Sequence, residues 1–103
     1  GENIADVSGL TIALLAYHKS LGGKRAPVID GLTGDERFFI AFGQAWRGKI
    51  RDAALRQRLA TDVHAPGPFR ALTVRNLDDW YQAFPVKPGE KLYLAPEQRV
   101  HIW

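Results

Sequence analysis

The chain has 103 residues, a length typical of one small domain, which excludes a multidomain organisation within it. Hydrophobic residues make up 46% and charged residues 24%, ordinary values for a globular protein that argue against disorder. The absence of cysteine excludes disulfides and thiolate metal sites, and no apolar run is long enough to span a membrane. The formal net charge is +3, and the basicity is local, because residues 47–58 hold five basic residues and one acidic residue.

The first half of the chain predicts three helices. Apolar residues recur every three or four positions from Ile4 to Leu21, and the glycine pair at 22–23 then ends this helix. Thr33 and Glu36 form a capping-box pattern that begins a second helix. A shorter helix is predicted from about Asp52 to Ala60. The second helix is predicted to carry four residues on one side, with Phe39 and Ile50 beside them: Phe38, Phe42, Trp46 and Lys49.

The second half is less regular. Residues 61–69 contain two prolines and a glycine, which predict a loop, and residues 70–75 are predicted to be extended. Asn76 is predicted to cap a short helix, and the tail at 91–103 alternates weakly, as a strand would. The sequence thus predicts one mainly α domain over residues 1–103, with about four helices and an irregular, partly extended C-terminal third. The apolar face of the short helix comprises Leu77, Trp80 and Phe84.

No complete active site is encoded by these residues alone. A zinc hydrolase needs about three protein ligands and an open position for water. The three histidines are far apart in sequence, and no H-E-x-x-H pair is present. Neither serine lies in a G-x-S-x-G turn, and no glycine-rich phosphate loop occurs.

Glu2 and Asp6 form a first candidate constellation. Their spacing of four places both carboxylates on one face at the start of the first helix. One could bind a metal ion while the other orients a neighbouring ligand. The alternative is that acidic residues here only complement the helix dipole, and on spacing alone this alternative is favoured.

Asp62, His64 and Arg70 form a second constellation, in and beside the Pro/Gly loop. A carboxylate next to an imidazole can fix its tautomer, and a nearby arginine could bind a carbonyl oxygen. The alternative is a solvated loop in which the aspartate caps a turn, and alone this is again the favoured interpretation.

Four short stretches of sequence, which occur in a fixed order, favour the functional interpretation of both constellations. They are GENIAD at residues 1–6, FFIAFGQAWR at 38–47, TDVHAPGPFR at 61–70 and the closing Ile102-Trp103. Together they resemble the C-terminal segment of the neprilysin-like zinc metalloendopeptidases, of the gluzincin type. The resemblance covers essentially the whole chain and implies the C-terminal part of a thermolysin-like catalytic domain. Cysteine-free versions of this segment look bacterial.

The resemblance assigns metal-site roles to the first constellation. Glu2 corresponds to the third ligand of one zinc ion in the full-length enzyme, whose two histidines belong to an upstream H-E-x-x-H helix. Asp6 corresponds to the carboxylate that orients one of those histidines. Because that helix is not in this chain, zinc is expected to be absent from the 103 residues alone.

The resemblance also assigns the substrate side. His64 corresponds to the histidine that stabilises the tetrahedral intermediate, and Asp62 to the carboxylate that orients it. Arg70 corresponds to the arginine that binds a substrate carbonyl and pairs with Asp6. Ala45 and Trp46 correspond to part of the pocket for the residue after the cleaved bond.

These roles predict the C-terminal part of an endopeptidase that cleaves oligopeptides on the amino side of bulky apolar residues. The chain begins with Gly1 rather than Met, so we expect a longer parent polypeptide and an inactive isolated segment. An extracytoplasmic parent, periplasmic or secreted, is expected from the family. The aromatic residues are many for so small a core, so the isolated segment is expected to expose apolar surface and to self-associate.

Two other classes of function stay open at this point. Residues 47–58 could form a small basic helical module that binds nucleic acid or an acidic protein. A run of charges is more often a solvated helix face, so no nucleic-acid partner is predicted. The chain could also be an interaction domain that keeps the peptidase fold without catalysis.

Overall fold

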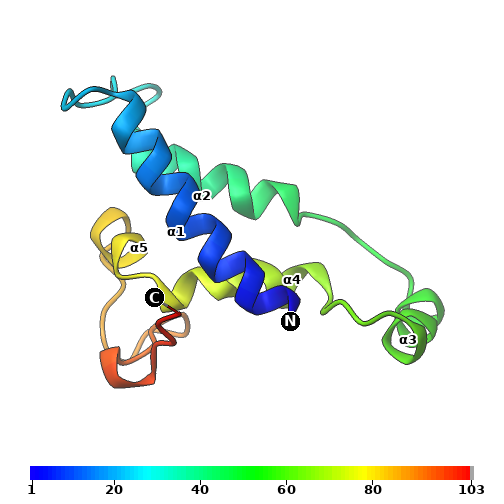
Figure 1. The fold of residues 1–103 in the computed structure, drawn as a ribbon. Helices are drawn as coiled ribbons and strands as arrows, with labels where there is room; N and C mark the ends of the chain where they lie inside the picture. The colour runs from blue at the N-terminus through cyan, green and yellow to red at the C-terminus, as the bar shows by residue number, and fades with distance from the viewer. Residues whose placement is uncertain (103) are drawn as a thin grey trace.

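The computed structural model describes residues 1–102, and this part of the chain is helical without a sheet (Figure 1). The predicted mainly α fold is therefore confirmed. Five α-helices and two short 3-10 helices follow one another: α1 (Glu2–Ser20), α2 (Gly34–Ala45), α3 (Asp52–Thr61), α4 (Gly67–Ala71), η1 (Leu72–Asn76), α5 (Asp78–Ala83) and η2 (Pro96–Gln98).

Helix α1 is the longest element and the centre of the fold. Val7, Leu10 and Leu14 are buried, as the helical spacing predicts, and they face η1. The helix ends one residue before the turn in which Gly22 and Gly23 adopt positive φ angles of 59° and 80°. Glycine adopts this conformation without strain, so the predicted stop signal is confirmed.

The opposite side of α1 is also apolar. No residue from 7 to 17 is charged, and Ile4, Ile12 and Leu15 are all exposed. A helix that is apolar on every side is normally buried on every side. This second apolar stripe is therefore typical of a surface that packs against another part of a protein. Within residues 1–102 no helix is long and apolar enough to cross a membrane.

Helix α2 begins with the predicted capping box. The Thr33 hydroxyl accepts a hydrogen bond from the Glu36 amide at 3.2 Å, and the Glu36 carboxylate accepts one from the Thr33 amide at 2.8 Å. The helix ends at Ala45, earlier than predicted, and Trp46 is its C-cap residue. Lys49 and the residue after it consequently lie in a linker and not on the aromatic face.

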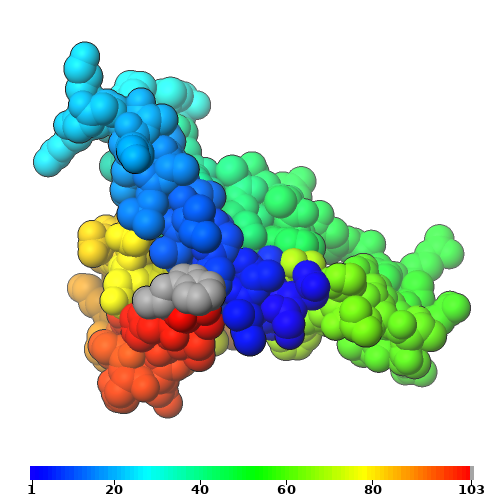
Figure 2. Space-filling model, viewed as in Figure 1, coloured from blue at the N-terminus to red at the C-terminus, as the bar shows by residue number. Residues whose placement is uncertain are grey.

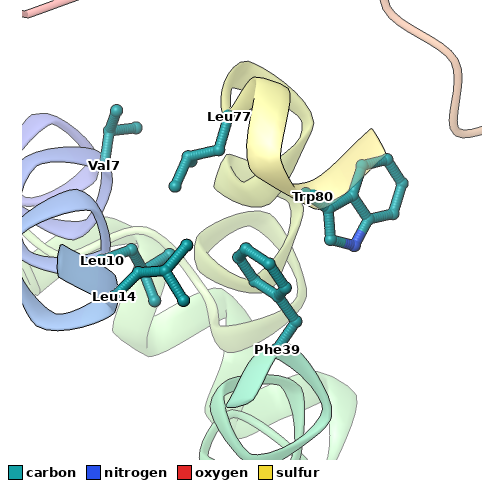
Figure 3. Close-up of a cluster of buried hydrophobic side chains, with 6 residues drawn as sticks. All are labelled: Val7, Leu10, Leu14, Phe39, Leu77 and Trp80. Carbon is teal, nitrogen blue, oxygen red and sulfur yellow. The ribbon is translucent and has the colours of Figure 1, made fainter. Parts of the chain in front are cut away.

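The core is small and lies where α1, α2 and α5 meet (Figure 3). Several aromatic side chains pack against it, including Phe38, Phe42, Tyr81 and Phe84. The exposed apolar surface is mainly aliphatic instead. Six residues are buried in the core: Val7, Leu10, Leu14, Phe39, Leu77 and Trp80.

Helix α3 lies apart from this core, at the end of an extended linker (Figures 1 and 2). It has no buried residue. The radius of gyration is 15.4 Å, against about 13 Å for a compact chain of this length. The accessible surface is 7643 Å², against about 5,800 Å² for a typical folded protein of this mass. The segment thus exposes far more surface than an independent domain of its size.

Four predictions for the second half are wrong in detail. The predicted loop at 61–69 is shorter, because α3 ends at Thr61 and α4 begins at Gly67. Residues 70–75 are helical and not extended, because α4 continues directly into η1. Asn76 does not cap α5, whose N-cap residue is Leu77, and its side chain bonds Thr73 and Val100 instead. No strand forms in the tail up to residue 102. Trp103, the last residue of the fourth stretch of sequence, lies outside the described residues.

Side chains hold the irregular tail in place. The Arg75 guanidinium donates to the carbonyl oxygens of Leu92 and Tyr93, at 2.9 and 3.1 Å. The Arg99 guanidinium stacks 3.7 Å from the Tyr81 ring centroid and pairs with a carboxylate of α5 at 2.7 Å. These contacts hold the tail in place of a sheet ladder, and η2 is its one regular element up to residue 102.

Candidate active site

The first predicted constellation is at the N-terminal end of α1, beside α4 (Figure 1). Asp6 accepts two hydrogen bonds from Arg70, one from Nε at 2.7 Å and one from Nη2 at 2.8 Å. The two side chains are only 8% and 13% exposed. This bidentate geometry matches the fork of a guanidinium, and the hydrogen bond to Asp6 raises the pKa of Arg70.

Unlike Asp6, Glu2 has a carboxylate that is free to bind a ligand. It lies one turn earlier on the same face, and its side chain is 45% exposed. Its Oε2 atom lies 3.8 Å from both His64 Nε2 and Arg70 Nη2, and it accepts no hydrogen bond within residues 1–102. A free anionic oxygen suits a divalent metal ion, whereas both oxygens of Asp6 are already engaged by Arg70. Glu2 is therefore the carboxylate of this pair that fits a zinc ligand.

The second constellation is a tight turn at the end of α3. Asp62 Oδ1 accepts hydrogen bonds from the His64 amide at 2.8 Å and from His64 Nδ1 at 2.7 Å. Those bonds lower the pKa of Asp62 to about 2, with a further contribution from Arg58. Because an ionised carboxylate can only accept, Nδ1 must carry the proton. The turn thus fixes the ring and leaves Nε2 facing Glu2.

The Asp62–His64 turn predicts that the stability of the fold changes over a defined range of pH. The folded pKa of Asp62 is below its ordinary value of 3.8, so the carboxylate stabilises the fold above about pH 4 and loses this effect as the pH falls towards 2. We expect the stability difference between the unmodified protein and Asp62→Asn to be constant from neutral pH to about pH 5, and to shrink between about pH 4 and 2. Urea unfolding at a series of pH values measures this. A difference that does not change down to pH 2 would contradict the assignment.

The structure brings the two constellations together. The Glu2 carboxylate lies between the ring of His64 and the guanidinium of Arg70, so α1, the α3–α4 loop and α4 meet at one site. No group of three or more potential metal-ligating side chains is found in residues 1–102. The site therefore has one candidate metal ligand and needs others to complete a metal centre.

Ala45 and Trp46 lie at the edge of this site, where α2 ends. Both line a groove of about 410 Å³ together with the linker and the start of α4. The Arg70 guanidinium lies over the Trp46 ring, with Cζ 4.1 Å from the centroid. The indole thus forms part of the groove wall and also contacts the guanidinium of the Arg70–Asp6 ion pair.

Sequence reasoning missed two residues of this site. Arg58 donates to Asp62 Oδ2 at 3.0 Å, a contact that the spacing of four residues on one helix could have indicated. Gly67 contacts the backbone of Trp46 closely, with no room for a Cβ atom. No local pattern marks that approach, because it joins two different helices.

Comparison with known proteins identifies the family. Residues 1–100 match the sequence model described as peptidase family M13. The chain belongs to this family. The prediction of a segment of a neprilysin-like metallopeptidase is confirmed.

Relatives and solved structures agree with this membership. The M13 segment is 38% identical to neutral endopeptidase of Lactobacillus helveticus and 36% identical to human neprilysin, over its full length and 14% of theirs. It superimposes on the crystal structure of the Mycobacterium tuberculosis zinc metalloprotease Zmp1 in complex with inhibitor, with a TM-score of 0.96 and 55% identity. The open state of that protein gives a TM-score of 0.95. The segment covers 16% of those chains, so it spans only a small part of the proteins it matches.

Proposed function

We propose that this M13 segment completes the active site of a longer zinc endopeptidase that hydrolyses oligopeptides. The observation that carries the proposal is the single site in which Glu2, Asp6, Asp62, His64 and Arg70 meet. Sites of this kind need a metal ligand, an oriented imidazole and a carbonyl-binding cation, and one residue is available for each.

Glu2 would hold zinc as a third ligand, together with two histidines of an H-E-x-x-H helix elsewhere in the parent polypeptide. Its free carboxylate and its exposure support this role. A bound zinc ion supplies Lewis-acid polarisation of the peptide carbonyl and of a water molecule. Asp6, which is held by Arg70, lies one turn away and still has lone pairs with which to orient a histidine of that helix.

His64 would stabilise the oxygen on which charge develops during peptide hydrolysis. Asp62 fixes its Nδ1–H, so in the doubly protonated state Nε2–H points out of the turn and can donate to that oxygen. The hydrogen bond from the amide of His64 to the same carboxylate keeps the ring in place without help from the substrate.

Arg70 would bind a backbone carbonyl of the substrate. Asp6 occupies Nε and one hydrogen of Nη2, so Nη1 keeps both of its donors for a ligand. The pairing also fixes the plane of the guanidinium, which reduces the entropy lost when a peptide binds.

Substrate preference is proposed from the groove at the end of α2. Its apolar lining includes Ala45, Trp46 and Leu55, which favours a bulky apolar side chain after the cleaved bond.

Membership of the M13 family supports a peptidase over a nucleic-acid-binding or purely structural module. Arg58, part of the basic run, is engaged with Asp62. An extracytoplasmic location of the parent stays a prediction.

The decisive experiment compares the full-length parent polypeptide with the 103-residue chain. We expect the parent to contain one zinc ion and to cleave an oligopeptide on the amino side of its bulky apolar residue, as identified by mass spectrometry. We expect the 103-residue chain to show no cleavage and no submicromolar zinc binding in calorimetry, because it offers one ligand. Tight one-to-one zinc binding by the short chain, or cleavage by it, would contradict the proposal.

Self-association of the short chain is a separate prediction. The exposed second stripe of α1 and the large accessible surface support it. Analytical ultracentrifugation over a hundredfold concentration range measures it, and a monomer throughout would contradict it.

A further inference from the structure

The guanidinium of Arg70 is held in two different ways. Its edge donates two hydrogen bonds to Asp6, and its Cζ lies over the Trp46 ring, 4.1 Å from the centroid. An edge-on pair alone leaves the guanidinium free to tilt about the axis of the pair. A flat aromatic surface beneath it removes that freedom, because a cation over a ring prefers a parallel stack.

Gly67 brings the start of α4 close to the backbone of Trp46. A Cβ atom at this position would lie 2.8 Å from the carbonyl oxygen of Trp46, closer than real Cβ contacts allow. The backbone of Gly67 is helical, so the restriction is one of space alone. Because Arg70 follows three residues later in α4, this close approach determines where its side chain meets the indole.

The indole itself is positioned by packing and not by a hydrogen bond. Its Nε1 is buried and has no acceptor within residues 1–102. Phe42 contacts the ring edge to face, at 6.2 Å between centroids and 75° between planes. A buried N–H without an acceptor is unfavourable, so the stability of this segment does not account for an indole here. The structure does show a contact for the aromatic face of the indole, which lies beneath the Arg70 guanidinium.

We propose that Trp46 and Gly67 are positioning residues for Arg70, with the indole acting as the platform that fixes the plane of the guanidinium. This role differs from the sequence prediction, in which Trp46 is only a wall of a side-chain pocket. The effect on catalysis rests on the proposed function of Arg70, whereas the effect on the geometry of Arg70 does not.

The first test is structural and uses the full-length polypeptide. Crystal structures are compared for Trp46→Phe, Trp46→Leu, Gly67→Ala and the control Gly43→Ala, at an exposed α2 glycine with open space around it. Phenylalanine keeps an aromatic face, so this variant and the control are expected to retain both hydrogen bonds between Arg70 and Asp6. The leucine and Gly67→Ala variants are expected to show a rotated guanidinium with at least one of these bonds lost. An unchanged Arg70 in both would overturn the proposal.

The second test is kinetic and uses a double-mutant cycle. Trp46→Leu is expected to lower kcat/KM about tenfold, and Trp46→Phe less than about threefold, in line with the strength of cation–π contacts. In an Arg70→Met background, Trp46→Leu is expected to cause a smaller loss, because only the contribution of the indole to the groove remains. An equal loss in both backgrounds would show that Trp46 contacts the peptide independently and would overturn the proposal. Full activity of Arg70→Met would instead refute the proposed function of Arg70, and the crystal structures would still decide the positioning role.

Discussion

Replacing Glu2 with glutamine in the full-length polypeptide is expected to remove both the bound zinc and the peptidase activity. The amide keeps the size of the side chain but loses the negative charge that a zinc ligand provides. Activity should fall by more than about 100-fold, since even a group that only hydrogen-bonds a metal ligand is worth about 10–100-fold. Metal content by mass spectrometry and hydrolysis of an oligopeptide measure the two effects together.

The matched control for this variant is Glu97→Gln, at an exposed glutamate of η2 in the tail. It makes the same chemical change away from the site and should leave zinc content and activity unchanged. Circular dichroism should show intact folding for both variants, because Glu2 makes no hydrogen bond within residues 1–102. A Glu2→Gln protein that kept one zinc ion per chain would contradict the assignment of this residue as a ligand.

Replacing His64 with alanine is expected to separate metal binding from turnover. The histidine faces the site through Nε2, and we assign it to the developing oxyanion and not to the metal, so zinc content should stay near one ion per chain. Losing a donor to the developing oxyanion should lower kcat by about 10²–10³-fold, with a smaller change in KM. Steady-state kinetics beside metal analysis provides the measurement.

Two further variants make this second prediction specific. Asp62→Asn keeps the shape of the turn but weakens the bond that fixes His64 Nδ1, so its loss of kcat should be smaller than that of His64→Ala. His101→Ala removes an exposed histidine of the tail and should have no effect. Normal turnover by His64→Ala would refute the role proposed for the α3–α4 loop.

Local signals in the sequence predicted much of the fold. The three-to-four spacing of Val7, Leu10 and Leu14 reports directly which face of α1 is buried, and the capping box of Thr33 and Glu36 locates the start of α2. Each of these patterns works because the interacting groups are within a few residues of one another. The Asp62–His64 turn is local in the same sense, with its partners two residues apart.

The remaining structure depends on contacts that have no local signal. Residues 70–75 form helix because Thr73 is buried against α1 and bonds the Arg70 carbonyl at 2.7 Å, whereas their composition alone favours extension. The tail is fixed by the arginines at 75 and 99, which no periodicity reveals. Only the family resemblance indicated that the Glu2–Asp6 pair meets the group of Asp62, His64 and Arg70. Spacing alone favoured a helix-dipole role for the first group and a solvated loop for the second.

The pairing of Asp6 with Arg70 joins side chains 64 residues apart in the chain. A ribosome adds about 5–20 residues each second, so the guanidinium emerges roughly 3–13 seconds after the carboxylate that it holds. Throughout that interval the nascent polypeptide has an acidic helix start without its cationic partner. The N-terminal end of α1 therefore cannot reach its final geometry until synthesis has passed residue 70.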